Sequence, residues 1–129
     1  MSLPTPTELQ ASTSFDLVIP PDPDLLRVVR LVASALASST DLGIDAVEAV
    51  RVAADELVTT LIQGGGDEVA VRYALTADHL VIAASTRLAD PGSFELDPLA
   101  DRILEQLTTS HRFEVDGDEL SGRIDIALP

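Results

Sequence analysis

Several kinds of residue are absent from this 129-residue sequence or rare in it. It contains no cysteine, so it has neither a disulfide framework nor a thiolate for catalysis or metal binding. It contains no lysine, which excludes the phosphate-binding P-loop, because that motif requires one. Aromatic residues make up only 3% of the chain, so we expect a core of Val, Leu, Ile and Ala side chains.

Positive charge is also scarce. The eight basic residues, all arginine, stand against 22 acidic residues, which gives a formal net charge of −14. A field of that sign repels phosphate backbones and anionic lipid head groups, so we expect no direct binding to nucleic acid or to a membrane. It favours a basic protein partner. It disfavours ATP, which brings roughly four negative charges unless Mg²⁺ offsets them.

The length and the hydrophobic content of 46% predict one folded domain. Residues 1–13 are polar and include Pro4 and Pro6, so we expect a flexible N-terminal tail followed by a single domain over residues 14–129. The N-terminus lacks the pattern of a signal peptide, and no apolar run approaches the roughly 20 residues of a membrane span. We therefore expect a cytoplasmic protein.

Hydrophobic periodicity predicts the secondary structure. Alternation with a period of two residues indicates strands, and apolar residues three and four apart indicate helices. Asp-Pro pairs at residues 22–23 and 97–98 are typical of helix starts, because Asp caps the helix and Pro fits its first turn. This order predicts an α+β two-layer sandwich, with a mixed or antiparallel sheet and about three helices on one face. The expected elements are strand 15–19, helix 23–38, helix 44–63, strands 69–75 and 80–84, helix 97–107, and strands 113–115 and 120–128.

Motifs for common catalytic and metal sites are missing. The two histidines, His79 and His111, do not form a zinc-binding pattern, and we expect both to lie on the surface. No serine is surrounded by the glycines of a hydrolase nucleophile elbow.

The second expected helix carries a pair of polar residues, Glu56 and Thr60, in R-V-A-A-D-E-L-V-T-T-L-I. Residues four apart share a helix face, so the pair lies beside the apolar stripe, where it could border a cavity between helix and sheet. An ordinary solvated helix face explains the same pattern, and periodicity alone favours that interpretation. Termination of the helix is enough to explain the three glycines that follow it, Gly64-Gly65-Gly66.

From about Phe15 to Leu128, the chain resembles the anti-sigma-factor serine kinases, the RsbW-like proteins of the GHKL superfamily, which have the Bergerat, histidine-kinase-like ATPase fold. The resemblance is carried by R-V-A-A-D-E-L-V-T-T-L-I, which looks like that family's N-box helix, by the element order, and by A-D-P-G-S-F in place of its first glycine box. It is similar above all to degenerate actinobacterial members of the family.

The resemblance implies roles for four residues. Glu56 matches the glutamate taken as the general base, and Thr60 stands where an asparagine usually binds Mg²⁺. Asp90 and Gly92 match the aspartate that contacts adenine and its neighbouring glycine, whereas Phe94 replaces the next glycine of that box. The implied cofactors are ATP or ADP with Mg²⁺.

The family's second glycine box is replaced by D-P-L-A-D. Asp97 and Asp101 would oppose a triphosphate at this helix start, and Pro98 removes an N–H donor. Asp97 is better explained as the cap of its own helix. Phosphoryl transfer depends on positioning and on charge neutralisation, so these substitutions predict a degenerate nucleotide site.

The resemblance also implies partners. In that family the first strand and the first helix form a homodimer contact, and an arginine near the start of the helix binds the sigma factor. Arg27 matches this arginine, and Arg30 lies one turn further. Two arginines that only maintain solubility are an equally valid interpretation. The acidic composition of this chain favours binding to a sigma factor, because the DNA-binding surfaces of sigma factors are basic.

These observations lead us to expect an anti-sigma-factor-type regulator that sequesters a sigma factor, forms a homodimer, and is released by an anti-anti-sigma factor. One alternative is an active ATP-dependent serine kinase that phosphorylates the anti-anti-sigma factor. A second is a dimerisation or scaffold module that binds no sigma factor.

Overall fold

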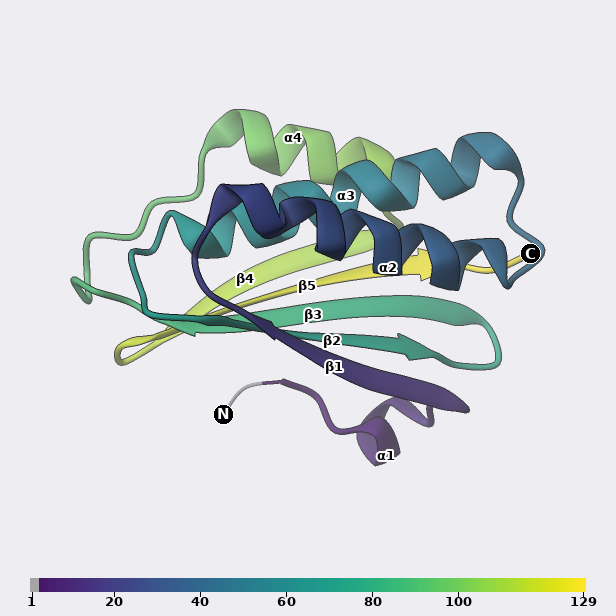
Figure 1. Ribbon diagram of the computed structural model, residues 1–129, viewed down its shortest axis with the longest axis horizontal. Helices are drawn as coiled ribbons and strands as arrows, with labels where there is room; N and C mark the ends of the chain where they lie inside the picture. Colours follow the sequence, from purple (N-terminus) through teal and green to yellow (C-terminus); the bar gives the residue numbers. More distant parts are fainter. Residues whose placement is uncertain (1–2) are drawn as a thin grey trace.

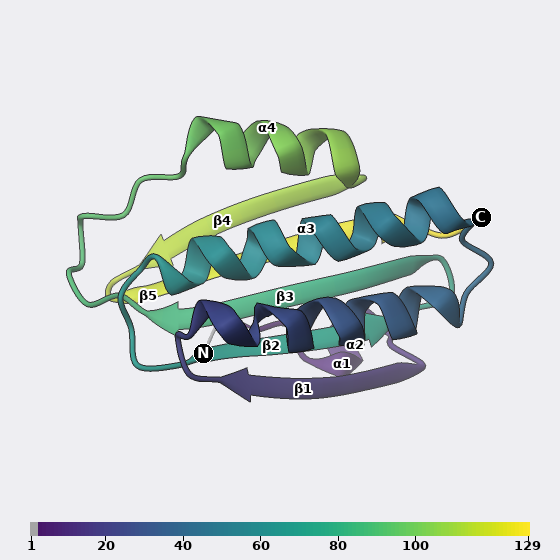
Figure 2. The ribbon, with the colours of Figure 1, turned by 45° about the horizontal axis from the view of Figure 1, so that its top comes forward.

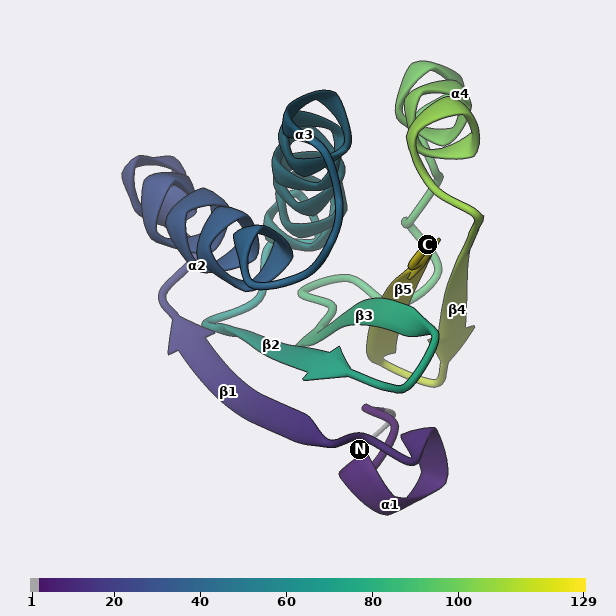
Figure 3. The same ribbon diagram turned by 90° about the vertical axis from the view of Figure 1, so that its right-hand side faces the viewer.

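The computed structural model describes residues 3–129 and shows one antiparallel sheet with three helices on one face (Figure 1). A fourth, short helix lies on the other face, which we call the open face (Figure 3). The strands are β1 (Thr13–Ile19), β2 (Val69–Leu75), β3 (His79–Arg87), β4 (Ser110–Asp116) and β5 (Glu119–Ala127). The helices are α1 (Pro6–Leu9), the 3-10 turn η1 (Pro23–Leu25), α2 (Leu26–Ser38), α3 (Ile44–Ile62) and α4 (Pro98–Leu107).

The five strands lie in the order β1-β2-β3-β5-β4, and every neighbouring pair is antiparallel. The strands β1 and β4 are therefore the two edges of the sheet. Viewed from the helical side, α2 lies over β1 and β2, α3 over the centre, and α4 over β4 (Figure 2). The predicted α+β sandwich is confirmed, and its sheet is wholly antiparallel.

The Asp-Pro helix starts form as the sequence predicts. Asp97 accepts a hydrogen bond from the backbone N–H of Leu99 at 2.9 Å, with Pro98 in the first turn of α4. Asp22 accepts one from the N–H of Asp24, also at 2.9 Å, although this start is a 3-10 turn that then leads into α2. In both places the side chain satisfies a donor that has no partner within the helix.

The core lies between the sheet and α2 and α3. Tyr73 of β2 is fully buried and donates a hydrogen bond to the backbone oxygen of Val29 in α2, at 3.2 Å. The ring of Phe15 stacks on Tyr73, with the ring centroids 5.3 Å apart. Because side chains alternate along a strand, the neighbouring Arg72 points to the open face. The apolar stripe of α3 is buried from Val50 onward, but Ile44, which the sequence placed on it, is 88% exposed in the first turn.

The segment that the sequence predicted to be a flexible tail contains the helix α1. Leu3 is only 7% exposed, and the backbone oxygen of Pro4 accepts a hydrogen bond from Arg72 at 2.9 Å. We call residues 3–12 the N-terminal strap, because they cross the open face of the sheet (Figure 3). Residues 1 and 2 of the predicted tail lie outside the described residues. Proline and polar composition indicated a loose segment, whereas one buried leucine and one arginine fix its position.

The three glycines after α3 do more than end the helix. Gly65 has a positive φ of 77°, which glycine adopts without strain. A Cβ on Gly66 would lie 2.2 Å from the backbone oxygen of Arg87, and the N–H of Ala89 donates to the backbone oxygen of Gly64 at 3.1 Å. The glycines thus allow the end of β3 to pack closely against this loop, a contact that the sequence pattern did not reveal.

Candidate functional site

Thr60 points into its own helix. Its side-chain hydroxyl donates a hydrogen bond to the backbone oxygen of Glu56, one turn earlier, at 2.9 Å. The residue is only 4% exposed. Bonding of this kind is common for threonine inside helices and requires no ligand. The geometry leaves little room for Thr60 to hold a hydrated magnesium ion, because such an ion keeps several of its waters.

Glu56 lies at the partly exposed border of the same helix. Loss of solvation raises the pKa of its carboxyl group, and the negative charges of Asp55 and Asp97 raise it further. Within residues 3–129, the Glu56 carboxylate has no recorded hydrogen bond or ion pair. Its electrostatic neighbours are therefore acidic, and the capping residue of α4 is one of them. A raised pKa suits a proton acceptor, but a site of this charge opposes a triphosphate.

Asp90 and Gly92 lie in an exposed turn between β3 and α4. The backbone N–H and the hydroxyl of Ser93 both donate to the backbone oxygen of Asp90, at 3.1 and 2.7 Å. Gly92 has a φ of 94°, and a Cβ there would meet nothing within 4 Å. Glycine is therefore explained by backbone conformation. Over the described part of the chain, no hydrogen bond or ion pair joins Asp90 to Glu56.

Apolar side chains pack between α3 and the sheet. Phe94, from the β3–α4 loop, packs against Phe113 of β4, with ring centroids 6.4 Å apart. Phe113 and Leu57 of α3 both lie against Gly122, where an added Cβ would be 2.7 Å from each. Leu57 and Leu104 of α4 are fully buried. Phe94 thus packs against the core.

Four cavities of about 320 to 650 Å³ lie elsewhere on the molecule. None of them is lined by any of the four residues assigned to the nucleotide by resemblance. In residues 3–129 there is also no cluster of three or more His, Cys, Asp or Glu residues that could hold a metal ion. Of the side chains predicted to bind ATP with Mg²⁺, Thr60 is buried, Asp90 lies in an exposed turn, and Glu56 has Asp55 and Asp97 as the charged groups that raise its pKa.

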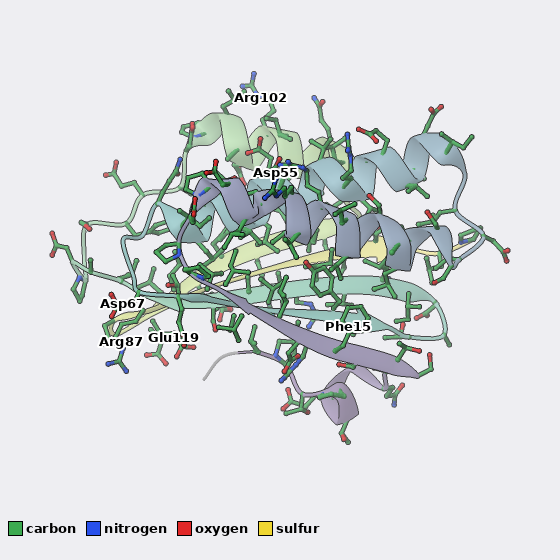
Figure 4. All side chains as sticks on the ribbon, in the orientation of Figure 1. Phe15, Asp55, Asp67, Arg87, Arg102 and Glu119 are labelled. Atoms are coloured by element: carbon green, nitrogen blue, oxygen red, sulfur yellow. The ribbon has the colours of Figure 1, made fainter. Side chains whose placement is uncertain are left out.

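The two arginines of α2 have different environments. Arg30 forms an ion pair with Asp55 of α3 at 3.0 Å, and both side chains are about one-third exposed. Asp55 also accepts a hydrogen bond from the hydroxyl of Thr59 at 3.2 Å, and it lies between the two helices (Figure 4). Arg27 is exposed, and among residues 3–129 it has no recorded ion-pair partner. Arg30 thus holds α2 to α3, whereas Arg27 faces solvent.

Sequence reasoning missed two features of this region. The Arg30–Asp55 pair explains why α3 carries an acid in its middle, but no local pattern reveals a contact between residues 25 apart. The Phe94–Phe113 contact depends likewise on the path of the loop. The one available signal was Phe94 itself, a large apolar residue in a loop.

None of the helices in residues 3–129 has the length and apolar composition that a membrane span requires. No protein-family model matches the sequence, and no curated protein matches it either.

The fold itself is similar to a solved structure, the RsbU and RsbW domains of Rv1364c from Mycobacterium tuberculosis. The TM-score is 0.72 and the sequence identity 14%, and the match covers 91% of this chain and 33% of the other. This chain therefore spans about a third of the length of that protein chain. Such a low identity bears on the fold alone. The chain has an α+β fold with a five-stranded antiparallel sheet, and its fold is similar to that solved structure.

Proposed function

We propose that this protein is an anti-sigma-factor-type regulator, which binds and sequesters a sigma factor in the cytoplasm and has a degenerate nucleotide site. An anti-anti-sigma factor would release the sigma factor by competing for the regulator. The fold supports this class of partner-switching protein, and the acidic composition supports a basic partner.

One observation carries the proposal: Leu57 of α3 and Phe113 of β4 both pack against Gly122 of β5, and Phe94 packs on Phe113. Phosphoryl transfer requires a cavity that positions the phosphates and groups that neutralise their charge. Glu56 instead has Asp55 and Asp97 as the charged groups that shift its pKa. A domain that keeps this fold but lacks such a cavity and such groups can still bind other proteins through its surface.

Arg27 is the proposed sigma-factor contact. It lies exposed in the first turn of α2, and no ion pair within the described residues occupies it. Arg30 is assigned a different role, because its guanidinium group is paired with Asp55. Arginine is common among the residues that dominate the binding energy of protein interfaces, so reversal of one exposed arginine should have a large effect.

The proposed homodimer uses β1 and α2. The strand β1 is an edge of the sheet, so its outer backbone groups have no strand partner, and such edges pair readily with other chains. Val18 of β1 is 56% exposed and Leu31 of α2 is 67% exposed. Sedimentation should detect a dimer that Leu31→Asp weakens, because a carboxylate would be desolvated in the contact.

The test of the function is binding to each sigma factor of the host, measured by surface plasmon resonance. We expect one sigma factor to bind, and Arg27→Glu to weaken it more than about tenfold, or 1.4 kcal/mol. Arg102→Glu is the matched control, since Arg102 is an exposed arginine on α4 (Figure 4). Circular dichroism should show both variants folded. If no sigma factor binds, the proposal fails and the scaffold alternative replaces it.

The serine kinase alternative makes a separate prediction. A kinase should transfer phosphate from ATP to a serine of its antagonist, and Glu56→Ala should abolish the transfer if Glu56 is the base. Our proposal predicts no phosphate transfer by the wild-type protein or by Glu56→Ala. Transfer that Glu56→Ala leaves unchanged would establish a kinase and remove Glu56 from its mechanism.

A further inference from the structure

A cavity of about 650 Å³ lies at the end of the sheet where β2 begins and β3 ends. Three segments line it: the glycine loop after α3 with the start of β2, the end of β3 with the residues that follow, and the start of β5. We call it the end cavity. Cavities of about 300 to 1,000 Å³ are typical of sites for small molecules. The end cavity shares no residue with the proposed nucleotide positions or with Arg27 and Arg30.

Negative charge predominates around the end cavity. Asp67, Glu68 and Glu119 line it, and Figure 4 shows Asp67, Arg87 and Glu119 together at this end of the sheet. Among the described residues, Arg87 is the one basic residue of the lining, and it forms an ion pair with a further acid, Asp118, at 3.4 Å. Four carboxylates thus stand against one guanidinium group, so this cavity favours a cation.

A buried hydroxyl group faces the same cavity. Ser85 lines it and is only 7% exposed, and within residues 3–129 its side chain has no recorded hydrogen bond. Its neighbour Thr86 differs, because that hydroxyl donates to the backbone oxygen of Glu68 at 2.7 Å. Over the described part of the chain, no fully enclosed polar side-chain atom lacks a partner, so the Ser85 hydroxyl is open to the cavity. Buried polar groups are generally hydrogen-bonded, which points to a partner inside the cavity.

The strand register keeps this hydroxyl accessible. Ser85 is paired with Ala70 of β2 on one side and with Ser121 of β5 on the other. These small side chains leave Ser85 uncovered on the open face. Ala70 and Ala89 also line the cavity and add apolar carbon to its wall. The end cavity therefore combines a buried hydroxyl, small apolar walls, and the exposed carboxylates of Asp67 and Glu68.

These groups fit an organic cation better than a metal ion. In residues 3–129 there is no group of three or more His, Cys, Asp or Glu residues placed to hold a metal. A guanidinium group carries five N–H donors in one plane and is more weakly hydrated than an ammonium group. It therefore suits a site that has acceptors on several sides, one of them buried. The apolar stem of an arginine side chain can pack on the alanines of the wall.

We propose that the end cavity binds the guanidinium group of an arginine side chain from a partner protein. The N–H groups of this arginine donate to the hydroxyl of Ser85 and to the carboxylate of Asp67, and its stem contacts Ala70 and Ala89. Ser85 and Ala70 lie on the open face, opposite α2. The site is thus separate from the proposed sigma-factor contact, and its test requires no sigma factor.

The experiment is an NMR titration of the full chain, labelled with ¹⁵N, with N-acetyl-L-arginine methylamide in about 150 mM salt. We expect saturable shifts of the backbone amide signals of Ser85 and Gly66, which line the cavity. The citrulline analogue has nearly the same shape but no charge, and it should bind about tenfold more weakly. The lysine analogue should bind roughly threefold more weakly, because its ammonium group is more strongly hydrated.

Two variants test the residues that carry the site. Ser85→Ala should weaken binding of the arginine probe by about tenfold, because a hydrogen bond to a charged group is lost. It should leave the unfolding midpoint unchanged, since that hydroxyl has no recorded partner in the free protein. Asp67→Asn should weaken binding by roughly threefold, because an exposed carboxylate contributes less. Asp41→Asn is the matched control: Asp41 is an exposed acid before α3, at the opposite end of that helix, and its removal should not change binding.

Four results would overturn the proposal. The first is no saturable binding of the arginine probe by the wild-type protein. The second is a Ser85→Ala variant that binds the probe as tightly as wild type. The third is equal weakening by Asp67→Asn and Asp41→Asn, which would show general charge attraction. The fourth is tighter binding of spermidine than of the arginine probe, which would show a site for a free polyamine rather than for a protein side chain. Circular dichroism of each variant identifies any loss of fold.

Discussion

The space under α3 and the open face of the sheet differ in packing and in charge. Under α3, Leu57 and Phe113 pack against the sheet, and the charges that act on Glu56 are acidic. On the open face, cavities remain and arginines line them. The resemblance points to the first region as a ligand site, whereas the cavities lined by arginine lie in the second. Shared architecture therefore does not establish that a site is retained.

The largest expected effect comes from opening the packed region. Leu57→Ala removes a fully buried side chain from α3 and should lower the free energy of unfolding by about 3 kcal/mol. Leu57→Met, which nearly conserves volume, should cost less than about 1.5 kcal/mol. Urea denaturation followed by circular dichroism measures both. Equal, small losses for the two variants would contradict the close packing described under α3.

The glycine loop that packs against the end of β3 should show the next largest effect. Gly66→Ala places a Cβ against the backbone oxygen of Arg87 and should destabilise the protein by about 2 kcal/mol. Gly43→Ala is the matched control, because a Cβ at that position meets nothing within 4 Å and φ is already negative. A Gly66→Ala protein as stable as the control would show that the loop does not require this close approach.

The ion pair between α2 and α3 should contribute less. A double-mutant cycle with Arg30→Ala and Asp55→Ala should give a coupling energy of about 0.5 kcal/mol, because both side chains are one-third exposed and water screens their charges. The coupling should decrease at high salt. A coupling of zero would leave Arg30 free for the partner contact that the sequence first suggested.

The smallest effect concerns Glu56 and pH. Its pKa is raised in the folded protein, chiefly by loss of solvation and also by Asp55 and Asp97. The free energy of unfolding should therefore fall as the pH rises from the ordinary glutamate range through the raised pKa. Over this range the folded state loses a proton that it binds more tightly than the unfolded state does. Glu56→Gln should be slightly more stable than wild type at neutral pH and equal to it in acid. Identical pH profiles of the unfolding midpoint would contradict the acidic environment.

The order of elements was predictable because it depends on local patterns. Alternating residues in β2 and the Asp-Pro start of α4 determine their own structure, and both predictions are confirmed. The position of Ile44 was not predictable, since its helical spacing is correct but no element covers the first turn of α3. The same holds for the N-terminal strap, which is fixed by a contact between Pro4 and Arg72, 68 residues apart.

The candidate site was only partly predictable. The helix that carries Glu56 and the cap at Asp97 are local features, and the structure contains both. That Thr60 turns back to its own helix depends on burial against the sheet, which a helix-face argument does not determine. The contact of Phe94 with Phe113 depends on the path of a loop, and loops carry little periodic signal.

The most direct test of the account is calorimetric titration of the purified protein with ATP and with ADP, each with and without Mg²⁺. Because apolar side chains pack under α3 and acidic groups act on Glu56, we predict no saturable binding up to about 1 mM nucleotide, that is, a binding free energy weaker than about −4 kcal/mol. Saturable binding in the micromolar range, about −8 kcal/mol, would contradict the account and restore the kinase interpretation.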